Sequence, residues 1–548
     1  MGGFRKVELP RGQIVLWSQS LEDAVAGDHP VRLFEQMLGG AAFGEVFREW
    51  RREYVLLEGR PPYDPRDLAG LYLYGMLHRL RSSRQLEGAC HNRLDVIWLM
   101  QSQKPDHATI AGFVARHGKL LKKLFRQTIR VALKAGLVKL AHVSVDGTKL
   151  EADAGRGSVR SREWLEAAKA KRAAEAEAAE AAEAAAAELE KEWAANEVKE
   201  SKLFSEQSPP ADAQAGPPGS AARRAAFQKK QAKLAEALAA IERRSQEADA
   251  DGGTPPKAIA STTDPDARVM PDKQAKSKPG YNAQIAVDAE AGVILACDVN
   301  DRPEDVGQLT PMLKQVQEQT GSLPHECSAD SGYASGSELA ELERMNVSGY
   351  LPDAGQNSGI AKPDDKQAEA LAAARLGQAL TPEQWSALPR DNRKMLDKSA
   401  FTYDLPNKAY RCPAGVSLTV LRHSADRKTW GVAHRTQYGG NPACASCQYA
   451  KQCCANPAKG RTINRDQYED HRDRMRQKMA SDQGRARYKL RRQTVEPRFG
   501  MLKAALGVRR FMHRSLDKVG VEFSLLCTAM NIKVLLREWA KTGPALSP

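Results

Sequence analysis

The chain has 548 residues and a formal net charge of +14, so it is long enough for about two to four domains with a large core. Its positive charge favours a polyanionic partner, and nucleic acid is the first candidate. No apolar run reaches the ~18 residues of a membrane-spanning helix, and the N-terminus lacks the apolar core of a signal peptide. We therefore expect no membrane partner and a cytoplasmic location.

Residues 1–137 predict a helical N-terminal domain. Asp64–Asp67 (Asp-Pro-Arg-Asp) is a strong helix start, and Ser82–Gln85 fits a capping box. A longer helix is expected from Asp106 or Thr109, with lysines and arginines on its polar side. Short helices with external bases fit a DNA-binding domain, and they fit equally a bundle that packs on a neighbour without touching DNA.

Residues 138–159 predict the first strand of an α/β fold, because L-A-H-V-S-V-D-G-T-K-L is short, alternating and β-branched, with Asp146 at its end. Residues 160–258 are rich in Ala, Glu and Lys, which favours helix, and a Pro- and Gly-rich break near 209–219 divides them. We expect a helical hairpin inserted into the fold. The low complexity of this stretch leaves full or partial disorder as the alternative.

Residues 259–354 predict the rest of the same fold. A β-hairpin follows Gly280, and a helix is expected over 303–319. A short strand then ends at Asp330, and a helix over 335–346 and another short strand complete the unit. Strands and helices in this mixed order predict an α/β domain with helices flanking a mixed sheet.

Residues 355–480 predict an irregular insertion domain that bears five of the nine cysteines, and residues 481–548 predict C-terminal helices over 483–506 and 515–539. A C-x₂-C pair with two remote cysteines resembles a structural zinc site, and its expected ligands are Cys412, Cys444, Cys447 and Cys453, with Cys454 as the alternative fourth. The other interpretation is a set of reduced cysteines without metal.

Three acids form a candidate metal site. Asp146 and Asp330 each follow a predicted strand, where side chains from neighbouring strands converge. Glu496 is the single acid among ten Lys and Arg residues between Asp482 and Asp517. Carboxylates in this number can hold two Mg²⁺ or Mn²⁺ ions for phosphoryl displacement. Taken singly, each aspartate could instead be a turn residue before Gly or Ser-Gly.

Six stretches of the sequence carry a family resemblance: G-R-P-P-Y-D-P-R-D-L-A at 59–69, V-D-G-T-K-L-E-A-D-A at 145–154, T-D-P-D-A-R-V-M at 263–270, G-Y-N-A-Q-I-A-V-D at 280–288, A-D-S-G-Y-A-S-G at 329–336 and R-R-Q-T-V-E-P-R-F-G-M-L-K at 491–503. With them, the chain resembles bacterial insertion-sequence transposases of the DDE class, which have an RNase H-like catalytic domain. The resemblance implies that Asp146, Asp330 and Glu496 are the catalytic triad.

The related transposases carry Tyr, Arg, Glu and Lys around the third acid. Lys503 and Arg492 keep the expected gaps to Glu496, whereas Tyr488 stands one residue too early. Pro497 predicts a kink or a helix start at Glu496. Lys503 then lies about two turns further on and is expected to grip DNA. The candidate DNA-binding residues of this basic belt are Tyr488, Arg491, Arg492, Arg498, Lys503, Arg509 and Arg510.

The sequence thus predicts a DNA transposase that cleaves at transposon ends and transfers the freed strands into target DNA. Its expected partners are the terminal inverted repeats, the target DNA and further copies of itself in a homodimer or larger synaptic complex, associated with the bacterial nucleoid. The rival hypotheses are a nuclease of the same fold without strand transfer, a domesticated non-catalytic DNA-binding protein, and an assembly protein built on the helical hairpin.

Overall fold

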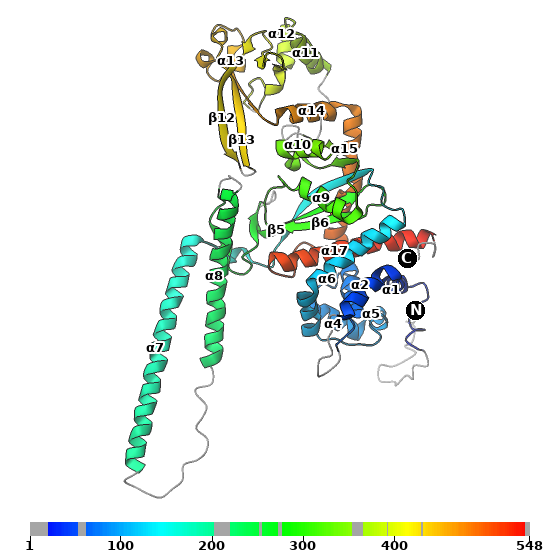
Figure 1. The fold of residues 1–548 in the computed structure, drawn as a ribbon, viewed down its shortest axis with the longest axis vertical. Helices are drawn as coiled ribbons and strands as arrows, with labels where there is room; N and C mark the ends of the chain where they lie inside the picture. The colour runs from blue at the N-terminus through cyan, green and yellow to red at the C-terminus, as the bar shows by residue number, and fades with distance from the viewer. Residues whose placement is uncertain are drawn as a thin grey trace, which may run out of the picture.

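The computed structural model describes residues 20–52, 62–201, 220–250, 255–271, 277–352, 365–391, 393–428 and 431–542 (Figure 1). The predicted break at 209–219 and the first part of the 59–69 motif lie outside these residues.

The N-terminal region is helical, as predicted. Asp64 accepts a hydrogen bond from the Arg66 amide at 2.8 Å and caps one helix. Ser82 and Gln85 form the expected capping box, and Asp106 caps the longest helix. The helices are α1 (Pro30–Gly39), α2 (Ala41–Arg52), α3 (Pro65–Leu77), α4 (Ser83–Asn92), α5 (Leu94–Leu99) and α6 (His107–Lys134).

A mixed sheet forms the centre of the molecule, with strand order β4-β5-β1-β7-β8 and β6 paired to β5. β1 runs antiparallel to β5 and parallel to β7. The hairpin and the later short strands match the prediction, so the fold is α/β. The strands are β1 (His142–Glu151), β4 (Arg268–Met270), β5 (Lys278–Asp288), β6 (Ile294–Asn300), β7 (Glu326–Ser328) and β8 (Ser348–Tyr350).

Helices α9 (Leu309–Thr320), α10 (Gly336–Arg344) and α17 (Leu516–Thr542) accompany this sheet. α9 begins six residues later than the predicted 303, because residues 303–308 form a loop that carries Asp305 to the sheet. α17 contacts both α6 and β6, and it lies between the N-terminal helices and the sheet (Figure 1).

Among the described residues, α17 is the one helix long and apolar enough to cross a membrane, with a mean hydropathy of 1.6 over its best window. The prediction that no run would meet this length was wrong for α17. However, 83% of that window is buried inside the structure, as in the core helix of a globular domain.

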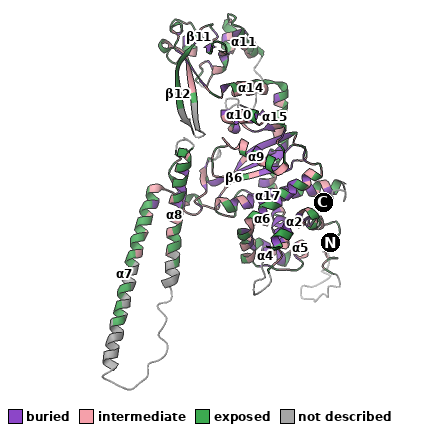
Figure 2. Ribbon diagram, in the orientation of Figure 1, coloured by how far each residue is buried: buried purple, intermediate pink, exposed green. Residues whose placement is uncertain are grey.

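The predicted insertion is a helical hairpin that projects from the core (Figure 1). β2 (Val159–Ser161) pairs with β3 (Ile259–Ser261) at its base, and α7 (Arg162–Ser201) and α8 (Ser220–Ala250) form its arms. A small cluster that includes Leu165 joins the two arms near the base. Most of the side chains described further along α7 are exposed (Figure 2).

The cysteine-bearing region has its own hydrophobic core, separate from that of the sheet. It is more regular than predicted, because short strands pair into two small sheets and an additional helix, α14, precedes the helix predicted from 483, which begins at Asp482. Its elements are α11 (Asp365–Leu376), α12 (Pro382–Ala387), β9 (Thr402–Asp404), β10 (Ala409–Arg411), β11 (Ser417–Leu418), β12 (Val420–Lys428), β13 (Gly431–Gly439), α13 (Ala450–Cys453), β14 (Thr462–Asp466) and α14 (Glu469–Ala480).

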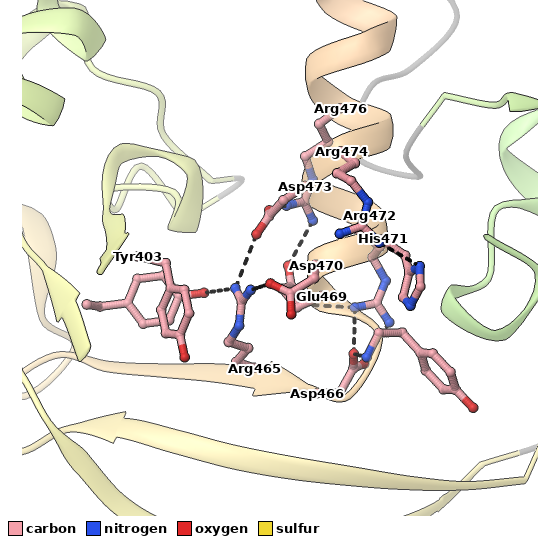
Figure 3. Close-up of polar contacts among 12 residues, drawn as sticks. Tyr403, Arg465, Asp466, Glu469, Asp470, His471, Arg472, Asp473, Arg474 and Arg476 are labelled. Carbon is pink, nitrogen blue, oxygen red and sulfur yellow. Dashed lines mark hydrogen bonds and ion pairs between the residues drawn. The ribbon is translucent and has the colours of Figure 1, made fainter. Parts of the chain in front are cut away.

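A polar network at the start of α14 lies where this region approaches the central sheet (Figure 3). Arg465 of β14 stacks on Tyr403, with 3.8 Å from its guanidinium carbon to the ring centroid, and pairs with Asp473 at 3.2 Å. Further along α14, Arg474 pairs with Glu343 of α10 at 2.7 Å. α14 therefore connects the small cysteine-bearing core to the helix beside the sheet.

Candidate active site

β1 and β7 bring the two aspartates together. The strands pair in parallel with Ser144 opposite Ser328, so Asp146 and Asp330 follow that pair by two residues each. One Asp146 oxygen accepts a hydrogen bond from the Gly147 amide at 2.9 Å, and one Asp330 oxygen accepts from the Gly332 amide at 2.8 Å. Asp146 lies within β1 and not at the end of the strand as predicted, whereas Asp330 begins the turn after β7, and each carboxylate is oriented by a backbone amide that follows it.

Glu496 reaches the same place from the C-terminal helices. α15 (Asp482–Thr494) ends before Val495, and Glu496 is the first residue of α16 (Glu496–Gly500), followed by the π-helical turn η6 (Met501–Ala505). The break coincides with Pro497, whose ring disfavours a continuous helix through Glu496. The prediction of a helix start at Glu496 is confirmed.

The three acids converge on one cation, the guanidinium of Arg491. Arg491 Nη2 lies 2.7 Å from an Asp146 oxygen and 4.0 Å from an Asp330 oxygen, and Nη1 lies 3.7 Å from a Glu496 oxygen. The Arg491 and Asp146 side chains are 14% and 11% exposed, whereas those of Asp330 and Glu496 are 39% and 49% exposed. The cluster therefore has a buried floor at Asp146 and an open rim.

Burial controls the electrostatics of the floor. It raises the pKa of the Asp146 carboxyl to about 6, and the Arg491 charge opposes the rise only in part, while the Asp330 charge adds to it. A carboxyl with a pKa of about 6 is mostly ionised at neutral pH, and the charge of Arg491 helps to keep the Asp146 pKa from rising further. The site is built to hold positive charge between the carboxylates.

The arginine that contacts the three acids is Arg491, whereas the family spacing to Glu496 pointed to Arg492. Arg492 keeps the family spacing to Glu496, but its side chain is exposed, and among the described residues no ion pair joins it to the three acids. Tyr488 lies one turn before Arg491, and their interaction is part of what sets the Tyr488 pKa, which burial raises. Tyr488 and Arg491 therefore face the acids together.

A second polar network lies behind the aspartates, and the sequence analysis did not identify it. Gln284 of β5 donates a hydrogen bond to Asp305 at 2.9 Å and accepts one from Tyr333, which follows Asp330 in the turn η2 (Ser331–Tyr333). Lys149 of β1 also contacts Asp305, at 3.0 Å. The motifs G-Y-N-A-Q and D-S-G-Y contain two of these residues, so the signal was present but had no assigned role.

Gly147 makes this network possible. A Cβ at Gly147 would overlap the Gln284 side-chain amide, so Gln284 can approach β1 only because position 147 has no side chain. Asn282 of the same strand donates to Asp305 at 2.7 Å, and its buried Oδ1 has no hydrogen-bond partner in the structure. The network thus depends on close packing of β1 against β5.

The predicted DNA-binding residues divide into two groups. Lys503 and Arg509 are exposed, and the charges of Asp146 and Arg509 both act on the Lys503 ammonium, whose pKa is lowered mainly by burial. Arg510 is also exposed and pairs with Asp153 at 3.7 Å. Lys503 therefore lies near the acid cluster, with Arg509 beside it.

Arg498 belongs to the other group, and the structure contradicts a DNA contact for it. Its residue is only 9% exposed, and its guanidinium packs against the β5–β6 turn, 3.3 Å from the Ala291 carbonyl oxygen. Burial lowers the pKa of this guanidinium. The close approach requires Gly292, because a Cβ there would overlap Arg498. Arg498 is thus a packing residue between α16 and the sheet.

The cysteines gather in one small pocket of the cysteine-bearing region. Burial raises the pKa of Cys412, and the neighbouring Cys444 and Cys447 add to the rise. The pocket lining includes the predicted ligands and the alternative fourth: Cys412, Cys444, Cys447, Cys453 and Cys454. The thiols are close enough to influence one another, and all of them are free.

Neither cluster has the geometry of a preformed metal site. Among the described residues, no group of three or more His, Cys, Asp or Glu side chains is arranged to hold an ion. In the acid cluster the reason is visible, since the Arg491 guanidinium takes the position between the carboxylates. Hard carboxylate oxygens around one cationic position fit a divalent cation in their chemistry, provided that Arg491 moves aside.

Comparison with known proteins agrees with this geometry. A family model described as "Transposase domain (DUF772)" matches residues 19–116. Two further models, each described as "Transposase DDE domain", match residues 255–387 and 411–536. A search of curated proteins found no match. The three matched segments together span the N-terminal helices, the strand before Asp330 and the helix of Glu496, and the chain belongs to the DDE transposases of insertion sequences.

Proposed function

We propose that Asp146, Asp330 and Glu496 form the catalytic centre of an RNase H-like domain, which cleaves DNA at transposon ends and joins the freed 3′ ends to target DNA. The observation that carries the proposal is the convergence of these acids, from two strands and one helix, on the single guanidinium of Arg491. A cation-binding cluster of carboxylates beside exposed basic residues suits a phosphodiester substrate.

Each side chain has a role that follows from its place. Asp146, at the buried floor, would hold positive charge deep in the site, and the more exposed Asp330 and Glu496 would hold it at the rim. Lys503 and Arg509 would bind the phosphates that flank the scissile bond. Bound Mg²⁺ or Mn²⁺ would activate the attacking oxygen and stabilise the leaving oxygen in both cleavage and joining.

The remaining assignments are proposals that rest on family membership and composition. The substrates are the terminal inverted repeats and target DNA, and the working assembly is a homodimer or larger synaptic complex, because two ends must be joined in one event. The N-terminal helices would read the repeats. The thiols that line the cysteine pocket supply the soft ligands that a structural zinc ion prefers.

Purified protein with Mg²⁺ and a duplex carrying one transposon end tests this function. Wild type is expected to give cleaved ends and joined products, and Asp330→Asn neither, with end binding retained. Asp28→Asn removes the charge of an exposed aspartate before α1 and serves as the matched control. Cleavage without joining would favour the nuclease, and full activity of Asp330→Asn would refute the proposed centre.

A further inference from the structure

The turn between α3 and α4 projects two arginines toward the C-terminal part of the chain. Arg79, in this turn, has a φ of 63°, a left-handed conformation that is uncommon for a residue with a side chain. Such backbone strain persists only where the surrounding contacts hold it. Here the local hydrogen bonds of a helix C-cap hold it, with the Leu80 amide donating to the Gly75 carbonyl oxygen at 2.8 Å, and the two arginine side chains reach residues more than 400 positions further along the chain.

Arg79 binds the end of the helical segment that carries Glu496 and Lys503. Its Nε donates to the Ala505 carbonyl oxygen at 2.7 Å, and its Nη2 donates to the Ala504 carbonyl oxygen at 2.8 Å. The last carbonyls of a helix have no intrahelical partner and carry partial negative charge, so a guanidinium there is favourable. Arg79 thus fixes where the π-helical turn η6 ends.

Arg81 contacts the chain a few residues further on, at Arg510 and Glu522. Its Nη2 donates to the Arg510 carbonyl oxygen at 2.8 Å and contacts Glu522 of α17 at 2.7 Å. Glu522 also accepts hydrogen bonds from the Met512 amide at 2.9 Å and the His513 amide at 3.1 Å. The carboxylate is 3% exposed, so these donors are its replacement for water.

The same stretch of chain, residues 504–513, also contacts the strand of Asp146. The Glu151 amide donates to the Arg509 carbonyl oxygen at 3.0 Å, and the Phe511 amide donates to the Glu151 carbonyl oxygen at 2.9 Å. The 504–513 segment therefore lies between the N-terminal helices on one side and β1 on the other. It directly follows Lys503 and includes Arg509.

We infer that Arg79 and Arg81 are positioning residues, through which the N-terminal helices hold the 504–513 segment so that Glu496, Lys503 and Arg509 meet Asp146 and the DNA in the geometry for cleavage. The inference rests on the proposed catalytic centre and extends it to residues outside the acid cluster. The helices that would read the transposon end also hold this segment. The contacts of Arg79 and Arg81 therefore connect the end-binding helices to the acid cluster.

Arg79→Ala is the principal test, since Arg79 is exposed and its loss is compatible with folding. Both Arg79→Ala and Arg81→Ala should lower the rate of end cleavage at saturating DNA by about tenfold or more, as expected from a misplacement on the order of 1 Å. Their affinity for end DNA should stay within about twofold of wild type. Arg81→Lys keeps a charge beside Glu522 and should recover part of the rate.

Arg84→Ala is the matched control. Arg84 is exposed in the first turn of α4, and its side chain makes no hydrogen bond or ion pair with any residue that the structure describes. Amide hydrogen exchange adds a readout that does not depend on activity. Exchange over residues 501–514 should accelerate in Arg79→Ala and remain unchanged in Arg84→Ala.

Three outcomes would overturn the inference. One is normal cleavage by Arg79→Ala, and another is unchanged exchange over 501–514. The third is a parallel loss of DNA affinity and cleavage in Arg79→Ala, which would make Arg79 a DNA contact. If Asp330→Asn still cleaved, the proposed catalytic centre itself would fail, and that result is independent of the arginine variants.

Discussion

The guanidinium of Arg491 lies 2.7 Å from the carboxylate of Asp146, and both side chains are largely buried. Three carboxylates gathered without a cation would repel one another, and burial would penalise the charge of Asp146 most. Arg491 offsets this cost in the structure as it stands. It also takes the central position that a divalent cation would need, so Arg491 and the metal compete for the same carboxylates.

Replacing Arg491 with Gln should therefore make the protein depend more strongly on Mg²⁺. Without metal, the variant leaves Asp146 without its ion-pair partner, a change that costs about 3–5 kcal/mol for a buried pair. The thermal unfolding midpoint in EDTA should fall, and added Mg²⁺ should raise it more in Arg491→Gln than in wild type. Thermal unfolding with and without Mg²⁺ measures both effects.

Arg492→Gln is the control for that experiment, because it removes the same charge from the neighbouring, exposed position. Its midpoint and its response to Mg²⁺ should match those of wild type. Equal Mg²⁺ responses in wild type and Arg491→Gln would show that Arg491 and the cation do not compete.

The network behind the aspartates leads to a second prediction, at Gly147. Alanine there would overlap the Gln284 amide and displace the side chain that links Asp305 to Tyr333. Because Tyr333 belongs to the turn of Asp330, we expect Gly147→Ala to lower the cleavage rate by about tenfold or more. The stability cost of such overpacking is about 1–3 kcal/mol.

Cleavage kinetics at saturating DNA, together with urea unfolding, separate the two effects of Gly147→Ala. Gly155→Ala is the matched control, since a Cβ at Gly155 would meet nothing within 4 Å. If Gly147→Ala cleaved at the wild-type rate, Gln284 and Tyr333 would have no positioning role for Asp330.

The sequence was sufficient to place the three acids but not the arginine between them. Asp146 and Asp330 could be predicted because each follows a short β-rich run, and Pro497 marked the helix start at Glu496. The family spacing to Glu496 points to Arg492, whereas Tyr488 stands one residue too early for that spacing. In the structure Arg491, one turn after Tyr488, contacts the acids, so the spacing from Tyr488 to the arginine is kept and the family spacing to Glu496 is not.

Contacts between distant segments could not be predicted in the same way. Arg498 looked like another base of the belt, and only the approach of Gly292 from the β5–β6 turn shows that it is buried. The Gln284 network likewise joins β1, β5 and the turn after β7. Local periodicity reports which face of an element is apolar, but it does not report which polar side chains meet across the fold.

Metal analysis would decide the role of the cysteine pocket. If the thiols bind a structural ion, purified protein should contain about one zinc per chain, and Cys447→Ser should lose it and unfold at lower temperature. Cys90→Ser changes a buried cysteine of α4, far along the chain from the pocket, and should keep the zinc. Wild-type protein without zinc, or full zinc retention in Cys447→Ser, would contradict the prediction.

The buried carboxylate of Glu522 gives a prediction for stability against pH. Burial alone would raise its pKa, but the hydrogen bond and charge of His513 and the charge of Arg81 hold the pKa below the usual 4.5. A carboxyl whose folded pKa is depressed stabilises the folded state above its unfolded pKa, and it loses that contribution as pH falls through the folded pKa. At neutral pH, Glu522→Gln should cost about 3 kcal/mol or more, since it breaks a buried ion pair.

The difference in free energy of unfolding between wild type and Glu522→Gln should then shrink as pH falls below 4.5, because the wild-type carboxyl takes up a proton. Urea unfolding of both proteins across this pH range measures the difference directly. Glu318→Gln, at an exposed position of α9, should stay within about 0.5 kcal/mol of wild type throughout. A difference in free energy of unfolding that stays constant with pH would mean that the charge of Glu522 does not hold the 504–513 segment against α17.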